Sequence, residues 1–306
     1  MNKKASPTVK QENGFNFSSI FPYIAIPIAL LTGWALYTFV LGDAANFEGG
    51  DPVKGHPLNI LGTVHKGGFI VPLLIAVNTI VIIFFFERLM TIVLIAQGRP
   101  WYLILIWVVF GFLPGILVTT LYRLIVTKKS ILDDSVLVKR VNNLLDDSNV
   151  NGAITLCDQQ RTSVAAVLKS GLLKYKEMEQ NTTLEKDEKI ASIKQEIEEA
   201  TALELPMLSK NLVILSTCGS LGVLVGLLGT VKGMISSFEA MATAGAPDAT
   251  ALSLGISEAL INTFLGIMAS AIAIIFYNFF NTRIDSMTFA MDEAGLTVSQ
   301  SYGKKH

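Results

Sequence analysis

Several hydroxyl, amide and carboxylate side chains stand inside long apolar runs of this sequence, where they could conduct ions. They are Thr230, Glu258, Asn262, Thr263 and Ser270. Because an ionisable side chain inside a bilayer is costly, Glu258 should face protein or water and not lipid. We therefore predict that these five residues line an ion pathway in which Glu258 handles protons or other ions. The alternative is that Glu258 is an interfacial glutamate with access to water.

A stripe of small residues shares one helical face with Thr230. At 100° per residue, its members fall within an arc of about 100°. They are Gly219, Gly222, Gly226, Gly229, Gly233 and Ser237. Glycines spaced four residues apart let a second helix approach closely, so we predict that these glycines, with Gly266 on the next apolar run, pack two helices together. Packing without conduction is the alternative interpretation of the whole stripe.

Ionisable side chains are otherwise scarce in these two runs. Lys232 lies about 200° from Thr230 around the helix, so we expect it to face lipid and to extend toward the headgroups. Apart from Glu258, neither run contains Asp, Glu or His in its membrane portion. A complete proton path needs a protonatable group at mid-depth, so the sequence indicates a second protein that supplies it.

The composition indicates a membrane protein. Hydrophobic residues make up 51% of the 306-residue chain and charged residues 16%, with a mean hydropathy of +0.51, whereas soluble domains contain about 25% charged residues. The apolar residues form five runs long enough to approach or cross a ~30 Å hydrocarbon layer. The runs cover 20–41, 69–96, 101–126, 211–238 and 252–280. We predict that the first is an uncleaved anchor and not a signal peptide, because it is long and contains two prolines.

Residues 128–205 form a charged segment between the third and fourth runs. The segment holds 11 Lys and Arg and 14 Asp and Glu, and its apolar residues recur at helical spacing. We predict a soluble helical segment that is continuous with the membrane helices, giving an all-α fold. From Leu184 to Phe238 we expect one long helix that Pro206 could bend, and we expect disorder at 1–18 and 298–306.

Lysine and arginine in short flanking segments predict the orientation. The segment 239–250 contains neither residue and should lie outside, whereas the charged segment and the N-terminal lysines should lie inside. Two inside ends require an even number of crossings, although five runs are present. Glycines and a proline at 111–115 interrupt the third run, so we predict a re-entrant or interfacial hairpin at 101–126. A fifth crossing with an outside N-terminus is the alternative.

The remaining sequence features argue against several classes of function. A net charge of −1 and a pI near 6.3 argue against a nucleic-acid partner. No Walker motif, dinucleotide fingerprint or HExxH motif occurs, so we expect no enzyme activity and no cofactor, and energy from an ion gradient or a partner. His56 and His65 lack metal-ligand spacing, and Cys157 and Cys218 cannot form a disulfide framework. We therefore expect no catalytic residue and no metal site.

Two segments around Thr230 and Glu258 have distinctive sequences. Leu224 to Phe238 reads LVGLLGTVKGMISSF, and Gly255 to Gly266 reads GISEALINTFLG. Both resemble segments of the ExbB/TolQ/MotA proton-channel family, most strongly its ExbB branch. The family's first membrane helix is similar to the segment that contains Gly67-Gly68, Val71-Pro72 and Glu87-Arg88-Leu89. The resemblance covers about 67–96 and 130–295.

This resemblance implies a homo-oligomer, pentameric in that family, in the inner membrane of a Gram-negative bacterium. Its partners would be an ExbD-like single-span protein, whose membrane aspartate lies beside the ion path, and a TonB-like protein that carries motion to the outer membrane. By position, Thr230, Glu258 and Thr263 match the family's pore threonines and glutamate. A TolQ-like or gliding-type motor is a second hypothesis, and a passive scaffold is a third. Asn262 and Ile272 depart from the family pattern.

These expectations divide the chain into seven segments. They are a disordered cytoplasmic tail (1–18), an extra N-terminal span with a periplasmic loop (19–66), the family's first transmembrane helix (67–98), an apolar insert (99–127), a cytoplasmic helical domain (128–207), two pore-lining transmembrane helices (208–282), and a cytoplasmic C-terminal helix and tail (283–306).

Overall fold

The computed structural model describes residues 17–53, 55–89, 91–92, 134–160, 162–243 and 249–305. These residues form helices and their connections, and the one β-bridge among them pairs Phe47 with Pro57. The prediction of an all-α fold is therefore confirmed. The hairpin predicted at 101–126 lies outside the described residues, as does the N-terminal tail up to residue 16.

Four of the described helices are long and apolar enough to cross a membrane. They are α1 (Phe17–Ala35), which continues as the π-helical η1 (Leu36–Leu41), α3 (Val71–Arg88), α10 (Leu212–Thr243) and α11 (Ala249–Lys305). They overlap the predicted apolar runs at 20–41, 69–96, 211–238 and 252–280, and α11 continues past its run to Lys305. The length and continuity of each apolar run were enough to predict a helix there, because the prediction does not depend on any single residue.

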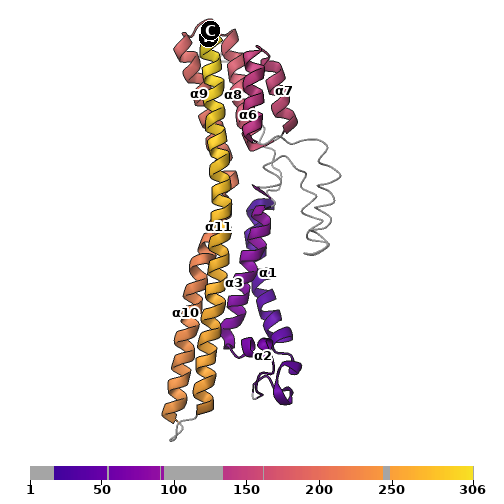
Figure 1. The fold of residues 1–306 in the computed structure, drawn as a ribbon, viewed down its shortest axis with the longest axis vertical. Helices are drawn as coiled ribbons and strands as arrows, with labels where there is room; N and C mark the ends of the chain where they lie inside the picture. The colour runs from indigo at the N-terminus through magenta and orange to yellow at the C-terminus, as the bar shows by residue number, and fades with distance from the viewer. Residues whose placement is uncertain are drawn as a thin grey trace, which may run out of the picture. The chain divides into compact units, whose positions relative to one another are not determined.

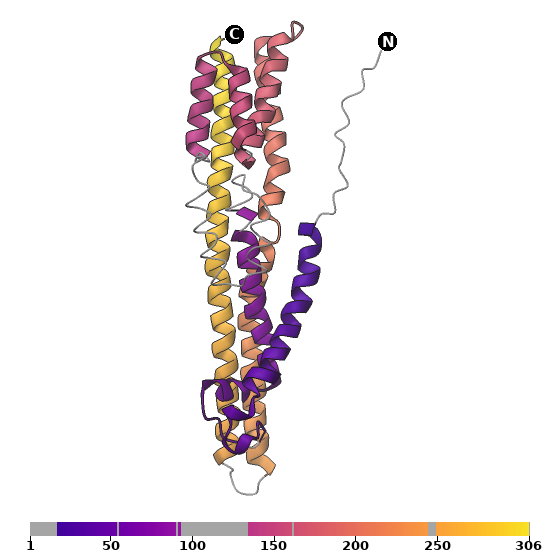
Figure 2. The same cartoon turned by 90° about the vertical axis from the view of Figure 1, so that its right-hand side faces the viewer.

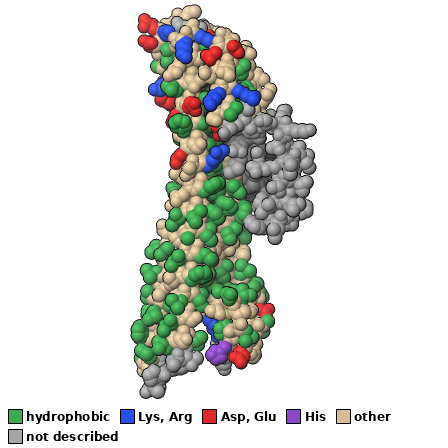
Figure 3. Space-filling view, in the orientation of Figure 1, with side chains coloured by type: hydrophobic (Ala, Val, Ile, Leu, Met, Phe, Trp, Pro, Cys, Tyr) green, Lys and Arg blue, Asp and Glu red, His purple; other side chains and the backbone are tan. Residues whose placement is uncertain are grey.

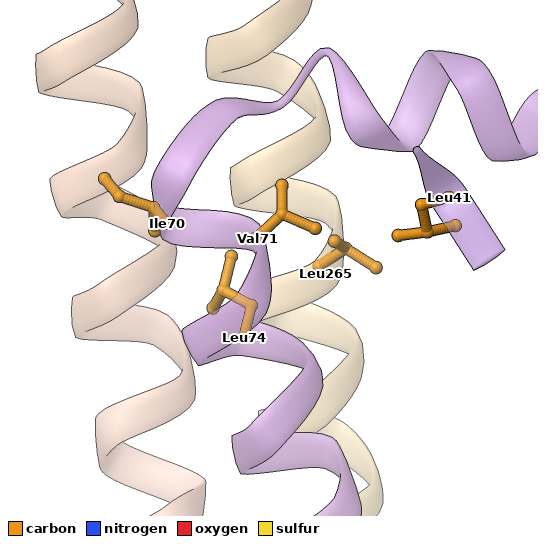
Figure 4. Close-up of a cluster of buried hydrophobic side chains, with 5 residues drawn as sticks. All are labelled: Leu41, Ile70, Val71, Leu74 and Leu265. Carbon is orange, nitrogen blue, oxygen red and sulfur yellow. The ribbon is translucent and has the colours of Figure 1, made fainter. Parts of the chain in front are cut away.

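One compact unit contains α1, the part of α3 up to Ile83, and the parts of α10 and α11 between Cys218 and Ser270. Within it, α10 and α11 run antiparallel and side by side (Figures 1 and 2). A cluster of buried side chains joins η1, η4 (Gly68–Ile70), α3 and α11 (Figure 4), namely Leu41, Ile70, Val71, Leu74 and Leu265. α1 meets α3 closely at Gly33, where an added Cβ would lie 2.5 Å from Pro72 O.

The connection between η1 and α3, which we call the cap, spans 43–67, and the structure describes 43–53 and 55–67 of it. Its elements are η2 (Ala44–Asn46), η3 (Glu48–Gly50) and α2 (Ile60–His65), and η4 (Gly68–Ile70) then leads into α3. Asn46 is buried and donates to Val40 O at 2.7 Å, and Asn59 donates to Asn46 Oδ1 at 2.8 Å. The His65 ring stacks on Tyr37 with 4.4 Å between centroids. These amide and ring contacts join parts of the cap to one another and to η1.

The second compact unit includes the helical head. The head comprises α6 (Asp134–Asp146), α7 (Val150–Gln160), α8 (Ser163–Gln180), α9 (Lys186–Ser209) and residues 284–305 of α11. Thr162 caps α8 by accepting from Ala165 N at 3.0 Å, and Glu185 forms a reciprocal capping box with Glu188 at the start of α9. Charged side chains gather over the head, and hydrophobic ones over the apolar parts of the membrane helices (Figure 3).

Two expectations for this part of the chain are wrong. α9 and α10 are separate helices, because the chain turns at Lys210 and Asn211, and Asn211 adopts a φ of 62°. Asparagine tolerates this left-handed conformation, which ends a helix, whereas Pro206 lies inside α9. The C-terminal residues expected to be disordered continue α11 to Lys305, and Val298 and Tyr302 are buried in the head.

Candidate functional site

α10 and α11 touch backbone to backbone along the stripe of small residues. A Cβ added to Gly222 would lie 2.8 Å from Gly266 O, and one added to Gly226 would lie 3.1 Å from Gly266 Cα. Further along, a Cβ on Gly233 would lie 2.7 Å from Gly255 O. Contacts this close leave no room for a larger residue unless the helices move apart.

Thr230 and Thr263 meet across this interface. Their hydroxyls form a hydrogen bond in which either oxygen can donate. Both hydroxyls also approach Ala259 O, from Thr263 at 3.0 Å and from Thr230 at 3.4 Å. Because a hydroxyl both donates and accepts, a pair of this kind can form part of a hydrogen-bonded chain that passes a proton.

Glu258 forms an ion pair with Lys232 of α10. The glutamate side chain is 12% exposed and the lysine side chain 38% exposed. The ammonium also lies 5.4 Å from the centroid of the Phe69 ring, within the range of a cation–π contact. The expectation that Lys232 faces lipid is therefore wrong. Its flexible side chain reaches the carboxylate instead, because pairing compensates the cost of a charge at this depth.

The start of α3 completes this group of contacts. Gly68 has a φ of +79°, and an added Cβ would lie 2.5 Å from Glu258 Oε1. Glycine combines this backbone conformation with the space that the carboxylate requires. The carbonyl of Gly67 accepts a hydrogen bond from Asn262 Nδ2 at 2.9 Å. Residues 67 and 68, which lead into α3, therefore contact α11 through one hydrogen bond at Gly67 and one close approach at Gly68.

The remaining predicted pathway residues lie in two different environments. Asn262 is 0% exposed, and its Oδ1 has no hydrogen-bond partner among the residues that the structure describes. Ser270 is buried and donates to Gly219 O of α10 at 2.6 Å. The structure therefore brings the two threonines and Ser270 into the α10–α11 interface. Glu258 and Asn262 also contact α10, at Lys232 and Gly229, and in addition they meet Gly68 and Gly67 just before α3.

Three residues of this group were absent from the predicted site, namely Lys232, Gly67 and Gly68. A helical wheel gives only the direction of Cβ, so it misplaced a long lysine side chain. The rule that a carboxylate in a membrane needs a partner would have matched Lys232 with Glu258 by charge. The sequence analysis used Gly67 and Gly68 only as part of the family resemblance. Their contacts with α11 were not predicted, because residue type alone does not give the backbone conformation.

A separate polar cluster lies in the second compact unit, at the end of α3, and we call it the α3 joint. Arg88 is 1% exposed and forms an ion pair with Glu87. Its Nη1 donates to Leu208 O at 3.3 Å, and Asn211 Nδ2 donates to Glu87 Oε1 at 3.4 Å. The α3 joint therefore connects α3 to the turn between α9 and α10.

Together, the fold and these contacts define a helical membrane protein with hydroxyl and carboxylate groups between its long apolar helices. The sequence model of the MotA/TolQ/ExbB proton channel family matches residues 159–293. This match confirms the predicted resemblance to that family, and it includes all five residues of the predicted ion pathway. α1, α2 and α3 lie outside the matched range, although the motif at Gly67 predicted α3 as the family's first membrane helix.

Curated relatives carry names from two branches of this family. The chain is 30% identical over 126 residues to the Tol-Pal system protein TolQ of Pseudomonas aeruginosa, which covers 41% of this chain and 54% of that protein. It is 34% identical over 91 residues to the biopolymer transport protein ExbB of Pseudomonas putida, covering 30% and 28% of the two chains. With ExbB of Salmonella typhimurium the values are 33% over 84 residues, covering 28% and 34%. The chain thus spans about half the length of these relatives or less, and identity does not separate ExbB from TolQ.

Proposed function

We propose that this protein is the proton-conducting subunit of an ion-driven membrane motor of the MotA/TolQ/ExbB type. The observation that carries the proposal is the hydrogen bond between Thr230 and Thr263 in the interface of two apolar helices. Helices that only pack could fill these positions with apolar side chains. A pair of hydroxyls backed by a shared carbonyl instead supplies a step for proton transfer.

The path needs a second protein. Between 212 and 238 and between 252 and 280, Glu258 is the only Asp, Glu or His. A membrane acid from a single-span ExbD-like partner would supply the missing protonatable group, and a TonB-like protein would carry the motion outward. Each proton that crosses 100 mV supplies about 2.3 kcal/mol, so work against a load needs several protons.

The surface of α10 supports assembly within a bilayer. Its side chains away from the stripe are large, apolar and exposed in the single chain, and they include Leu224, Leu227, Leu228 and Val231. Such a surface can contact either lipid or a neighbouring copy. We propose a homo-oligomer, pentameric as in the family, in the inner membrane of a Gram-negative bacterium, with the helical head on the cytoplasmic side.

The test replaces each hydroxyl with an isosteric methyl group. Thr230→Val and Thr263→Val should lower proton flux by at least about tenfold in vesicles that contain the purified complex, because each removes a proton-transfer step. Thr217→Val is the matched control, since Thr217 is exposed on α10 and donates to its own helix at Val213 O. Wild-type flux in both interface variants, with assembly intact, would overturn the proposal and favour a passive scaffold.

An ExbB-type role is proposed first and a TolQ-type role second, since the relatives include both names. Tagged full-length protein should co-purify with an ExbD-like protein and should be required for siderophore or vitamin import across the outer membrane. Unchanged import in a deletion strain, together with recovery of Tol-Pal components, would instead identify a TolQ-type subunit. The mass of the intact complex would give the number of copies.

A further inference from the structure

We propose that Lys232 determines the ion specificity of this pathway by holding Glu258 in an ion pair, so that protons pass and alkali-metal cations are excluded. This inference rests on the proposed function, because it concerns which ion the conduit admits. It goes further by assigning a role in ion selectivity to Lys232, which the predicted ion pathway did not include. The relevant contacts come from η4, α10 and α11.

The contacts fix the lysine and the carboxylate at one place. Glu258 is 12% exposed and pairs with the ammonium, which also lies 5.4 Å from the Phe69 ring centroid. On the other side, Gly68 brings its backbone so close that a Cβ would lie 2.5 Å from Glu258 Oε1. The carboxylate is therefore enclosed between the lysine and the start of α3.

This ion pair stands beside the threonine pair, toward the C-terminal end of α10 and the N-terminal end of α11. We call this the loop side, meaning the side of Thr243 and Ala249. Lys232 follows Thr230 by two residues and Glu258 precedes Thr263 by five. In antiparallel helices these displacements point the same way, and at 1.5 Å per residue they amount to about 3 Å and about 7.5 Å. An ion entering from the loop side would reach the ion pair before the hydroxyls.

Charge explains the selectivity. A lone carboxylate at the mouth of a conduit attracts any cation, and rings of acidic side chains serve that purpose in cation channels. The neighbouring ammonium cancels this attraction and repels a metal cation at short range. A proton is less restricted, because it transfers between hydrogen-bonded oxygens and does not need a vacant binding site at the carboxylate.

The ion pair itself can be tested without measuring conduction. A hydrophobic, membrane-permeant carbodiimide, which can reach both buried and exposed carboxylates, activates a carboxylate, and a lysine in contact then displaces the urea to form an amide bond. Peptide mass analysis of the full-length protein in membranes should detect an amide between Glu258 and Lys232. The pair of Lys169 and Asp158, 2.5 Å apart in the helical head, is the internal positive control. Recovery of the control link without the Glu258–Lys232 link would overturn the proposal.

The selectivity is tested by ion flux in vesicles that contain the purified complex. Lys232→Gln should raise sodium permeability relative to proton permeability by at least about tenfold, because it leaves the carboxylate unpaired. Lys232→Arg should retain sodium exclusion, and adding Glu258→Gln to Lys232→Gln should restore it. Lys66→Gln is the charge-matched control, since Lys66 lies in the cap and donates to Val53 O at 2.8 Å.

The possible failures are distinct. Wild-type protein that carries no protons would overturn the proposed function, and the specificity role with it, whatever the cross-linking result. Proton flux in the wild type with unchanged sodium exclusion in Lys232→Gln would overturn the specificity role alone. An equal rise in sodium flux in Lys66→Gln would show that general surface charge, and not the ion pair, sets the selectivity.

Discussion

Two independent features favour glycine at position 68, namely its backbone conformation and the close approach of the Glu258 carboxylate. A left-handed φ of +79° costs an L-residue about 1 kcal/mol or more, and a Cβ would also lie 2.5 Å from Glu258 Oε1. Gly49 has a similar φ of 72° but no atom within 4 Å of an added Cβ. We therefore expect Gly68→Ala to lower the Tm of the detergent-solubilised protein more than Gly49→Ala does. Equal shifts would contradict the contact with Glu258.

A second residue-scale prediction concerns the effect of pH on the cap. The His65 ring packs against Tyr37 and Phe47, so burial lowers its pKa, and the charge of Lys66 lowers it further. The unfolded chain, with a histidine pKa of about 6.5, then binds the proton more readily than the folded cap does. The stability contributed by neutral His65 is complete above that value and is lost as the pH falls toward the lower folded pKa.

Hydrogen exchange measures this effect directly. Protection of the amides in 43–66, corrected for the intrinsic pH dependence of exchange, should fall as the pH drops below the unfolded histidine pKa of about 6.5. His65→Gln should remove most of this pH dependence, whereas His56→Gln, at an exposed position in the same cap, should retain it. A response that survives His65→Gln unchanged would exclude His65 as its source.

Among the elements, the turn between α9 and α10 depends on the α3 joint. Arg88→Met would leave the Glu87 carboxylate and the Leu208 carbonyl without the guanidinium that they contact. Removing one partner of a buried ion pair typically costs about 3 kcal/mol or more. We therefore expect a loss of that size in the free energy of unfolding, measured by denaturant titration in detergent micelles.

Two further variants show whether burial causes this loss. Lys194→Met breaks the exposed pair with Glu198, 3.9 Å apart, and should change stability by less than about 0.5 kcal/mol. Adding Glu87→Gln to Arg88→Met should recover part of the loss, because no unpaired charge remains. If Arg88→Met costs no more than Lys194→Met, the α3 joint does not stabilise the turn.

The sequence was sufficient to predict helices and polar positions, but not the contacts between them. Thr230 and Glu258 could be identified because polar side chains are rare in apolar runs. Their partners depend on the spacing of α10, α11 and the start of α3, so the ion pair with Lys232 could not be read from one helix. The turn at Asn211 was missed for a similar reason, since a single left-handed residue leaves little trace in a hydrophobic pattern.

At the scale of the whole molecule, α11 contributes to both compact units as one uninterrupted helix of 57 residues. Its part up to Ser270 carries Glu258 and Thr263, and its last turns enter the helical head. We predicted a disordered tail at 298–306, but Val298 and Tyr302 repeat at four-residue spacing and share a buried face. Tyr302 donates to Met178 O at 3.1 Å and packs edge-on against Tyr175.

Removal of 298–306 should therefore destabilise the helical head, and Cys157 provides the measurement. In the intact head the thiol is buried, and burial raises its pKa to about 12, so it remains protonated and unreactive. Deleting the last turns removes the buried side chains of Val298, Ser299, Ser301 and Tyr302, together with the contacts of Lys305 at the end of α6. Transient opening of the head should then expose Cys157, and its alkylation at neutral pH should accelerate by about tenfold or more.

The control is a substitution on the exposed side of the same turns. It shows whether the buried side chains, and not any change in these turns, protect Cys157. Gln300→Ala leaves Val298 and Tyr302 in place, so the alkylation rate of Cys157 should stay at the wild-type value. Peptide mapping distinguishes Cys157 from Cys218, which lies in the other compact unit. If the truncated protein protects Cys157 as well as the full chain does, the last turns of α11 are dispensable to the head. The core would then depend on α6 to α9 and the preceding part of α11, where Met291 and Ala294 remain buried.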